Sequence, residues 1–438
     1  MGKDMSDTDK FELPEDVFER AKYHEFLTSY LSSVNTPFVI NIDAGWGYGK
    51  TYFIKQWINS ISNMHPAIYI NAWESDFSND PLLVLISEVT KGLEEAFPDS
   101  KALPDKVTSI ITKSGVFCKA GAPALVKGAA KYIMSEDGVN GIEEAIADSA
   151  GKLVEISLKE HSRFKSSIDK FKVELSSLKE VYDENDGLSG PLFIFVDELD
   201  RCRPTYSVEF LEQIKHIFSA EGIVFIIATD TTQLCHSIGA VYGEKFDSHL
   251  YLTRFFDREY VLPAPNYKRF ASALLSGKSY EGLLTFPEND DGEVFAEYFA
   301  FFANFFRLNL RTQEQCAARL DALLLVQEGG TIHVPYITFL IMLRAVSKED
   351  FNTWFHKREF VDKGYKSSET IMLYDNIGPI NVINAYLGCV FESRDKLMRK
   401  VNNMQAQSPN NSIAIEVHKN LNSIKTYKDK VELVGAVL

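Results

Sequence analysis

The stretch at residues 38–53, FVINIDAGWGYGKTYF, constrains the fold of this chain more than any other segment. It reads as a short apolar strand, then a turn rich in glycine, then the start of a helix. Glycines let a backbone turn tightly and aim several N–H groups at one anion, and the positive end of the helix points to the same place. At the junction, the amine of Lys50 and the hydroxyl of Thr51 suit a phosphate chain with bound magnesium. The segment therefore predicts a phosphate-binding loop of the Walker A kind.

One residue departs from the Walker A pattern, because Ala44 stands where the pattern has glycine. The strand before the loop and the amphipathic helix after it supply the context that the motif requires. No Asn-Lys-x-Asp string occurs in the chain, so no guanine reader is indicated and ATP is the expected nucleotide. The residues expected to bind the nucleotide here are Gly45, Trp46, Gly47, Tyr48, Gly49, Lys50, Thr51 and Tyr52.

Hydrolysis of a nucleoside triphosphate needs carboxylates at the end of a neighbouring buried strand. Asp197 and Glu198 follow the apolar run PLFIFV directly, which is the right place. We expect Thr51 to bind Mg²⁺ and Asp197 to hold it through water, and Glu198 to act as the general base that polarises the attacking water. The alternative is that the two acids only end a strand and cap the following helix.

Other charged residues are weaker candidates for the same site. Asp200 and Arg201 are expected either to brace the site, to pair with each other or to reach a neighbouring subunit. Asp230, after the next buried strand, either senses the γ-phosphate or caps the following helix. Arg254 is a candidate for stabilising the charge of phosphoryl transfer, in the same chain or from a neighbour, and Arg311 for closing on the nucleotide from the helical region. Both arginines are alternatively surface or ion-pair residues.

Short apolar runs alternate with helical patterns over the first 262 residues. The expected strands are residues 39–42, 67–70, 191–196 and 222–228, with a last short strand at 261–263. Continuous apolar runs such as PLFIFV are typical of strands buried on both faces of a parallel sheet. The pattern predicts an α/β fold, with a three-layer P-loop NTPase core and a mostly parallel sheet at residues 1–262. A helical insertion is expected at residues 98–188, where no strand-like run occurs.

After residue 265 the pattern predicts helices only. We expect a helical, lid-like subdomain at residues 263–345. Near the N-terminus, the pattern at residues 14–32 also predicts a helix. Residues 346–438 have weaker periodicity and are expected to form a mostly helical C-terminal region of open role.

Composition excludes several classes of protein. The net charge of −15 over 438 residues argues against broad non-specific binding to nucleic acid or to anionic membranes. Five cysteines are scattered without a Cys-x-x-Cys pair, which predicts a reducing compartment and no zinc site. The sequence has no uncharged apolar run of about 18 residues, so we expect no membrane span and a cytoplasmic location.

Several strings in one order resemble the KAP family of P-loop NTPases. They are DAGWGYGKT with Trp46 inside the loop, NAWESDFSNDP, FIFVDELDRCRP, GIVFIIATD followed by TTQL, YLTRFFDREYVLP and the LNLRTQEQ region. The resemblance spans about residues 14–345 and implies ATP binding and hydrolysis at Lys50, Thr51, Asp197 and Glu198. Many members of the family carry membrane helices between the two nucleotide motifs, whereas residues 98–188 contain no such span.

The resemblance also implies a functional setting. The family belongs to the same broad division as the STAND and AAA-type ATPases, which often work as oligomeric switches, and its members are scattered among bacteria, plasmids and phages. A role in antiphage defence or phage exclusion is an expectation at the level of the family. We expect an ATP-driven switch that forms homo-oligomers and acts through a protein partner or effector.

Three alternatives remain open. The first is a regulatory module that binds ATP with negligible turnover, which phosphate release from the purified protein distinguishes from a switch. The second is a nucleic-acid-associated ATPase, which the net charge disfavours and a salt-dependent gel shift tests. The third is a nucleotide kinase, which the Asp–Glu pair disfavours because that pair suits water rather than a phosphate acceptor.

Overall fold

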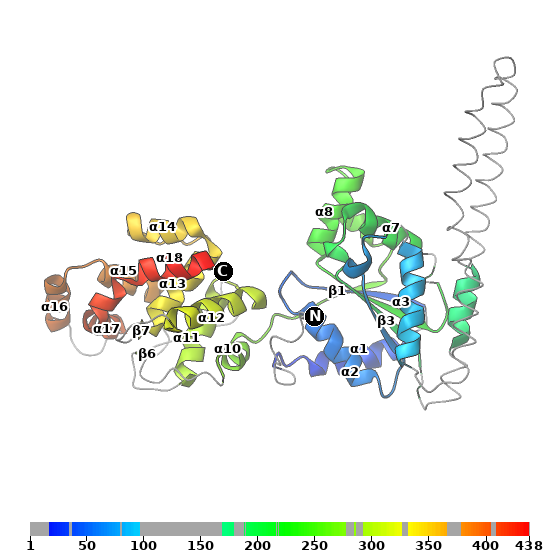
Figure 1. Ribbon diagram of the computed structural model, residues 1–438, viewed down its shortest axis with the longest axis horizontal. Coiled ribbons are helices and arrows are strands. Elements are labelled where there is room, and N and C mark those ends of the chain that lie inside the picture. The colour runs from blue at the N-terminus through cyan, green and yellow to red at the C-terminus, as the bar shows by residue number, and fades with distance from the viewer. Residues whose placement is uncertain are drawn as a thin grey trace, which may run out of the picture. The chain divides into compact units, whose positions relative to one another are not determined.

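The chain folds into two compact units, which are described separately (Figure 1). The sheet unit is Ala21–Leu262, and the helical unit is Met1–Arg20 together with Pro263–Leu438. The computed structural model describes residues 17–34, 37–78, 81–96, 169–178, 188, 190–215, 217, 219–276, 284–285, 292–325, 332–365, 378–403 and 409–437.

The sheet unit is built on five parallel strands in the order β2-β3-β4-β1-β5. The strands are β1 (Phe38–Asp43), β2 (Ala67–Asn71), β3 (Leu192–Asp197), β4 (Ile223–Thr229) and β5 (Arg258–Val261). Because all strands run the same way, the segments that follow β1, β3 and β4 leave the sheet at one edge. This edge brings together the glycine-rich loop and the two acidic segments.

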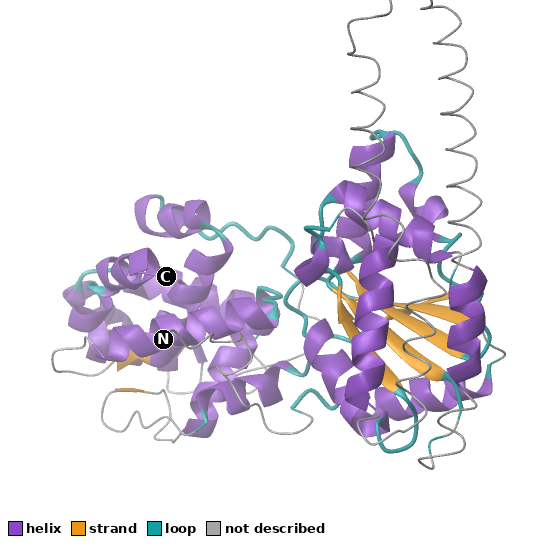
Figure 2. Ribbon diagram, turned by 45° about the vertical axis from the view of Figure 1, so that its right-hand side comes forward, coloured by secondary structure: helices purple, strands orange, loops and turns teal. Residues whose placement is uncertain are grey.

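Helices cover both faces of the sheet, as Figure 2 shows. One face carries α1 (Ala21–Ser33) and α2 (Lys50–Ile61), and the other carries α3 (Pro81–Ala96), the helix at residues 169–178, α7 (Pro204–Lys215) and α8 (Thr231–Tyr242). Alternate side chains of β3 show the arrangement: Phe193 and Phe195 pack with α1 and α2, whereas Ile194 and Val196 pack with the opposite helices. The predicted three-layer α/β fold with a parallel sheet is confirmed.

Two predicted boundaries in or beside the sheet unit were wrong. The last strand was expected at residues 261–263 but is Arg258–Val261, which begins three residues earlier and ends two residues earlier. Because β5 is an edge strand, its residues are exposed or half-buried, and the segment therefore has no continuous apolar run that would predict a strand. The first helix was expected from residue 14, whereas α1 begins at Ala21 and residues 17–20 are not helical. Residues 14–16 lie outside the described part of the chain.

The helical unit contains α10 (Tyr267–Leu275), α11 (Gly292–Phe305), α12 (Leu310–Leu325), α13 (Val334–Val346), α14 (Lys348–His356), α15 (Pro379–Val390), α16 (Arg394–Asn403), α17 (Pro409–Ile424) and α18 (Tyr427–Val437). The prediction of helices only was incomplete, because β6 (Leu284–Thr285) and β7 (Ile332–His333) pair in parallel. Strands of two residues are too short to produce a period-2 pattern, so no sequence pattern marks them.

A buried polar group lies in the core of the helical unit. His333 is fully buried at the junction of β7 and α13. Its Nε2 lies 2.9 Å from the hydroxyl of Tyr386, and its backbone N–H donates to the hydroxyl of Tyr427 at 2.7 Å. Glu416 Oε2 lies 3.5 Å from Nδ1, which would favour a charged ring, but complete burial outweighs this and lowers the pKa of His333 to about 3. The ring is therefore neutral in the folded unit.

The predicted insertion at residues 98–188 is described only in part. Residues 169–178 form a helix, within the segment expected to be helical, and Phe171, Leu175 and Leu178 of this helix are buried in the sheet unit. The rest of the predicted insertion lies outside the described residues, apart from residue 188. Among the helices that the structure describes, none has the length and apolar character that a membrane crossing requires.

Candidate nucleotide-binding site

The glycine-rich loop between β1 and α2 has the backbone that its sequence predicts. Gly47 and Gly49 have φ angles of 78° and 79°, in the left-handed region that other residues rarely adopt. Ala44, the departure from the Walker A pattern, is not among the described residues with positive φ, and its N–H donates to the carbonyl of Thr229 on β4 at 3.1 Å. Alanine is therefore compatible with the first position of this loop.

Lys50 lies at the start of α2 with its amine directed back over the loop. Its Nζ donates to the carbonyl oxygen of Ala44 at 2.6 Å and lies 3.9 Å from Asp200 Oδ2. The residue is only 8% exposed, so the ammonium is satisfied by the protein rather than by bulk water. A phosphate chain bound by this loop would have to take the lysine from these two partners.

Asp197, the last residue of β3, is fully buried at the same edge of the sheet. Its Oδ1 accepts from the backbone N–H of Glu198 at 2.8 Å, and its Oδ2 accepts from the hydroxyl of Tyr69 at 3.3 Å. Burial raises the pKa of Asp197 and outweighs the opposing effects of Thr51, the Glu198 N–H and Lys50. Tyr69 on β2 was not predicted from the sequence, where it is one aromatic residue among the apolar residues of a strand.

Glu198 is held in an unusual backbone conformation, with φ at 64°. Its Oε1 accepts from the Thr51 hydroxyl at 3.1 Å, and its Oε2 pairs with Arg201 Nε at 2.5 Å. Burial and the neighbouring Asp197 raise the pKa of Glu198, and Arg201 opposes this. The predicted general base is thus beside the loop, but both of its oxygens are engaged.

The donors around Thr51 fit a magnesium ion. The Thr51 hydroxyl donates to Glu198 Oε1 at 3.1 Å, and it lies near enough to Asp197 to act against the rise in the pKa of that carboxylate. Hydroxyl and carboxylate oxygens are the hard ligands that Mg²⁺ prefers. Thr51, with Asp197 through water, would hold the ion, which would neutralise charge on the phosphates.

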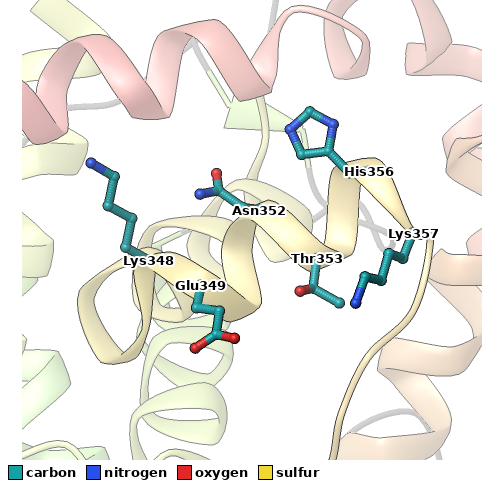
Figure 3. Close-up of a pocket in the computed structure, with 6 residues that line it drawn as sticks. All are labelled: Lys348, Glu349, Asn352, Thr353, His356 and Lys357. Carbon is teal, nitrogen blue, oxygen red and sulfur yellow. The ribbon is translucent and has the colours of Figure 1, made fainter.

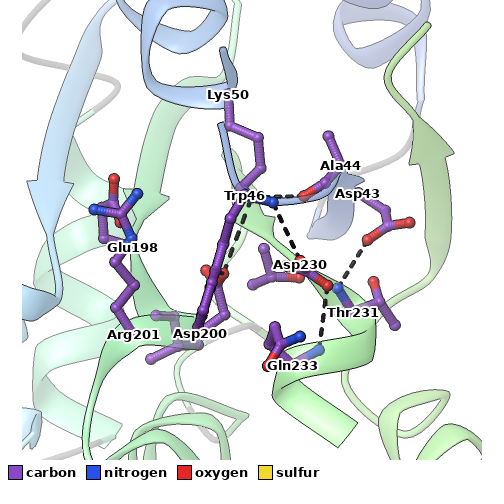
Figure 4. A network of polar contacts seen from close by, with 12 residues as sticks. Asp43, Ala44, Trp46, Lys50, Glu198, Asp200, Arg201, Asp230, Thr231 and Gln233 are labelled. Carbon is purple, nitrogen blue, oxygen red and sulfur yellow. Dashed lines mark hydrogen bonds and ion pairs between the residues drawn. The ribbon is translucent and has the colours of Figure 1, made fainter. Parts of the chain in front are cut away.

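Asp230 makes the helix cap that was one of its two predicted roles, and it also contacts the phosphate loop (Figure 4). Its Oδ1 accepts from the backbone N–H of Gln233 at 3.2 Å and caps α8. Its Oδ2 accepts from the backbone N–H of Trp46 at 3.2 Å, and so contacts the phosphate loop. Next to it, Asp43 Oδ1 accepts from the N–H of Thr231 at 2.8 Å. Whether Asp230 also senses the γ-phosphate stays a prediction.

A buried polar network connects the strands next to the loop. Asn41 of β1 is fully buried; its amide donates to Thr231 Oγ1 at 2.9 Å, and its carbonyl oxygen accepts from Thr229 Oγ1 at 2.9 Å. Thr231 Oγ1 in turn donates to Glu259 of β5 at 2.9 Å. These contacts fix β1, β4, β5 and the start of α8 in register. The sequence marks this network only by one asparagine inside the apolar run FVINI, and the network was not predicted.

Arg254 is not beside the loop of its own chain. It is exposed, and its guanidinium lies 5.4 Å from the ring centroid of Tyr251. Three residues later, Asp257 accepts from the N–H of Val39 at the start of β1, at 2.8 Å, so this segment lies toward the edge of the sheet opposite the loop. Arg254 was predicted to act in the same chain or on a neighbouring chain. Its position does not fit action in the same chain, and action on a neighbouring chain stays a prediction.

The remaining candidates are placed as follows. Tyr52 lies in the first turn of α2, and the ring of Tyr48 lies so close to Gly45 that a Cβ there would be 3.2 Å from it. A side chain at position 45 would therefore require the ring of Tyr48 to shift by a few tenths of an ångström. Arg311 lies on α12 in the helical unit, and its predicted role as a lid residue stays a prediction.

A shallow hollow elsewhere lies along α14 and is lined by Lys348, Glu349, Asn352, Thr353, His356 and Lys357 (Figure 3). Five of the six side chains belong to α14 and the sixth, Lys357, caps its C-terminus, so these groups do not converge on a ligand from different elements. We assign no function to this hollow.

The parallel sheet, the glycine-rich loop with Lys50 and Thr51, and the carboxylates after β3 together define a P-loop NTPase domain. Residues 20–323 match the KAP family P-loop domain, and the chain belongs to this family. The resemblance found in the sequence is confirmed.

Comparison with other proteins adds little to this. No curated protein matches the chain. Among solved structures, the ORC2 protein of Aeropyrum pernix in ADPNP–ADP complexes is 11% identical, over 98% of this chain and 89% of that one, with a TM-score of 0.38. The ADP form of the same protein is 10% identical, over 97% of each chain, with a TM-score of 0.34. Membership of the family rests on the sequence match.

Proposed function

We propose that this chain binds ATP with Mg²⁺ and hydrolyses it, and that it works as a molecular switch acting through a protein partner. The observation that carries the proposal is the contact between Thr51 and Glu198, with Lys50 and the buried Asp197 beside them. A phosphate-binding loop, a hydroxyl suited to magnesium and a carboxylate that can polarise water are the parts that hydrolysis requires.

In this proposal each residue has one role. Lys50 and the N–H groups of the loop bind the phosphates, and Thr51 and Asp197 hold the magnesium ion. Glu198 orients and deprotonates the attacking water once its carboxylate is released from Arg201. A partner, a homo-oligomer and a setting in antiphage defence or phage exclusion are part of the proposal, and they rest on what members of the family do.

The experiment is Glu198→Gln in the full chain. Glutamine keeps the shape and a hydrogen bond to Thr51 but cannot accept a proton, so phosphate release should fall about 10²-fold or more while ATP binding is retained. Steady-state phosphate release and calorimetric binding measure the two quantities. Unchanged turnover would remove Glu198 as the base. The matched control is Glu209→Gln, on α7.

A second candidate is a regulatory module that binds ATP with negligible turnover. The ion pair between Arg201 and Glu198, at 2.5 Å, favours it, because a base that is fully engaged does not take a proton from water. Phosphate release measured over a range of protein concentrations separates the candidates. A rate per molecule that rises with concentration supports a switch activated by assembly, and no release at any concentration supports the module.

A further inference from the structure

Trp46 and Asp200 make a contact that the proposed reaction does not use. The indole Nε1 of Trp46, inside the loop, donates to Asp200 Oδ2 at 2.5 Å (Figure 4). Asp200 belongs to the short helix η3 (Leu199–Arg201) that follows Glu198 directly. The contact therefore joins the phosphate-binding loop to the segment that carries the proposed base.

The same oxygen of Asp200 also attracts Lys50. Lys50 Nζ lies 3.9 Å from Oδ2, and the side chain of Asp200 is only 1% exposed. The other oxygen, Oδ1, is buried and has no hydrogen-bond partner among the described residues. A carboxylate removed from water depends on the few donors and cations that it contacts. Trp46 and Lys50 therefore both interact with the same oxygen of Asp200 and compete for it.

We propose that Trp46 and Asp200 are positioning residues for Lys50, which together set how firmly the lysine is held before a nucleotide binds. Asp200 attracts the lysine away from the phosphate position. Trp46 weakens that attraction, because it occupies the same carboxylate oxygen. The inference rests on the proposed binding of ATP, and the indole of Trp46, which is 44% exposed, is accessible to a ligand in the loop.

Two substitutions separate the two contacts and should act in opposite directions. Asp200→Asn keeps an acceptor for the indole but removes the charge that competes with phosphate for Lys50, so ATP should bind about tenfold more tightly. Trp46→Phe keeps an aromatic ring but leaves the carboxylate to Lys50, so ATP should bind about threefold more weakly. A role only in stability would weaken binding in both variants.

Titration calorimetry of the full chain with ATP and excess Mg²⁺ measures these affinities. Trp73→Phe is the matched control, because it is the same substitution at another exposed indole, 53% exposed; its ring lies 5.8 Å from the guanidinium of Arg201, and no described contact joins it to the loop or to Asp200. Its affinity for ATP should equal that of the wild type. Effects of the same sign in the two test variants, or no effect in Asp200→Asn, overturn the inference.

A measurement without nucleotide separates failure of this inference from failure of the proposed function. In thermal unfolding, the double variant Trp46→Phe/Asp200→Ala should lose less stability than the sum of the two single losses, because each single change already breaks the contact. Additive losses overturn the inference even where ATP binds. Retained coupling in a protein that binds no ATP would instead overturn the proposed function, and the role toward Lys50 with it.

Discussion

At the scale of single residues, the groups proposed to bind and hydrolyse ATP already contact other groups of the protein. The amine of Lys50 is taken by Ala44 and Asp200, the backbone N–H of Trp46 by Asp230, and both oxygens of Glu198 by Thr51 and Arg201. Each of these groups is one that the proposed reaction needs. Binding of ATP must therefore exchange protein contacts for contacts with phosphate, which limits the affinity that the loop alone can reach.

Lys50→Ala tests the loop at this scale. Without the ammonium the phosphates lose a charge-assisted contact, so affinity for ATP should fall about 10²-fold or more. Calorimetry on the full chain measures it. Lys91→Ala is the control, because Lys91 is an exposed lysine on α3 that pairs only weakly with Glu95, at 3.8 Å. Equal affinity of Lys50→Ala and wild type would contradict the predicted role of the loop.

At the scale of elements, the packing of α2 on the sheet fixes the start of that helix. Trp57 of α2 is fully buried, its indole donates to Thr28 of α1 at 2.8 Å, and its ring meets Phe195 of β3 edge-on at 5.2 Å between centroids. This one side chain joins α1, α2 and the sheet. The position of Lys50, two turns earlier on α2, depends on it.

Trp57→Ala should lower the free energy of unfolding of the sheet unit by about 3–5 kcal/mol, because it leaves a large cavity and an unpaired hydroxyl on Thr28. Denaturant unfolding followed by circular dichroism measures the loss. The same substitution at the exposed Trp73 is the control and should cost less than about 1 kcal/mol. Similar losses in both variants would show that Trp57 is not a core residue.

The buried His333 makes the helical unit sensitive to acid. Its pKa in the folded unit is about 3, below the value of 6.5 in the unfolded chain, so the unfolded state binds the proton first. Stability should therefore be full above pH 6.5 and fall by up to about 1.4 kcal/mol per pH unit between pH 6.5 and pH 3. Denaturant unfolding at pH 7.5 and pH 5 measures the fall.

His333→Gln keeps hydrogen-bonding capacity for the hydroxyl of Tyr386 but does not titrate. The variant is expected to be less stable than the wild type at pH 7.5, with a smaller loss on going to pH 5. An equal loss in the two proteins would mean that His333 is not the group responsible.

At the scale of the whole molecule, assembly is the proposed means of control. Arg254 lies away from the loop of its own chain and is exposed, so it is available to the site of a neighbour. We expect a slowly hydrolysed ATP analogue to shift the protein to a larger species in size-exclusion chromatography with light scattering.

Arg254→Ala should then reduce phosphate release about 10²-fold or more without weakening ATP binding, because an arginine supplied by a neighbour acts on the transition state. Arg258→Ala, a nearby exposed arginine on β5, is the control. Full activity of Arg254→Ala, or a protein that stays monomeric while hydrolysing ATP, would contradict this role.

The sequence by itself determined the parallel sheet, the loop and the location of the carboxylates. Continuous apolar runs such as PLFIFV can only be buried on both faces, and a parallel sheet places their carboxyl ends at one edge. The tight turn at Gly47 and Gly49 could also be predicted, since the left-handed backbone found there excludes most other residues. These features are local or follow from strand direction.

Only the tertiary structure decided which side chains contact one another. The pairs Trp46–Asp200 and Thr51–Glu198 join residues 154 and 147 positions apart, and no local pattern encodes such a distance. Edge strand β5 was misplaced because it lacks an apolar run, and the two-residue pair β6–β7 was missed because it is too short for a period. Asp230 shows the difference most clearly: the sequence offered a helix cap or a γ-phosphate sensor, whereas the fold shows the cap together with a contact to the Trp46 N–H, because β4 ends beside β1.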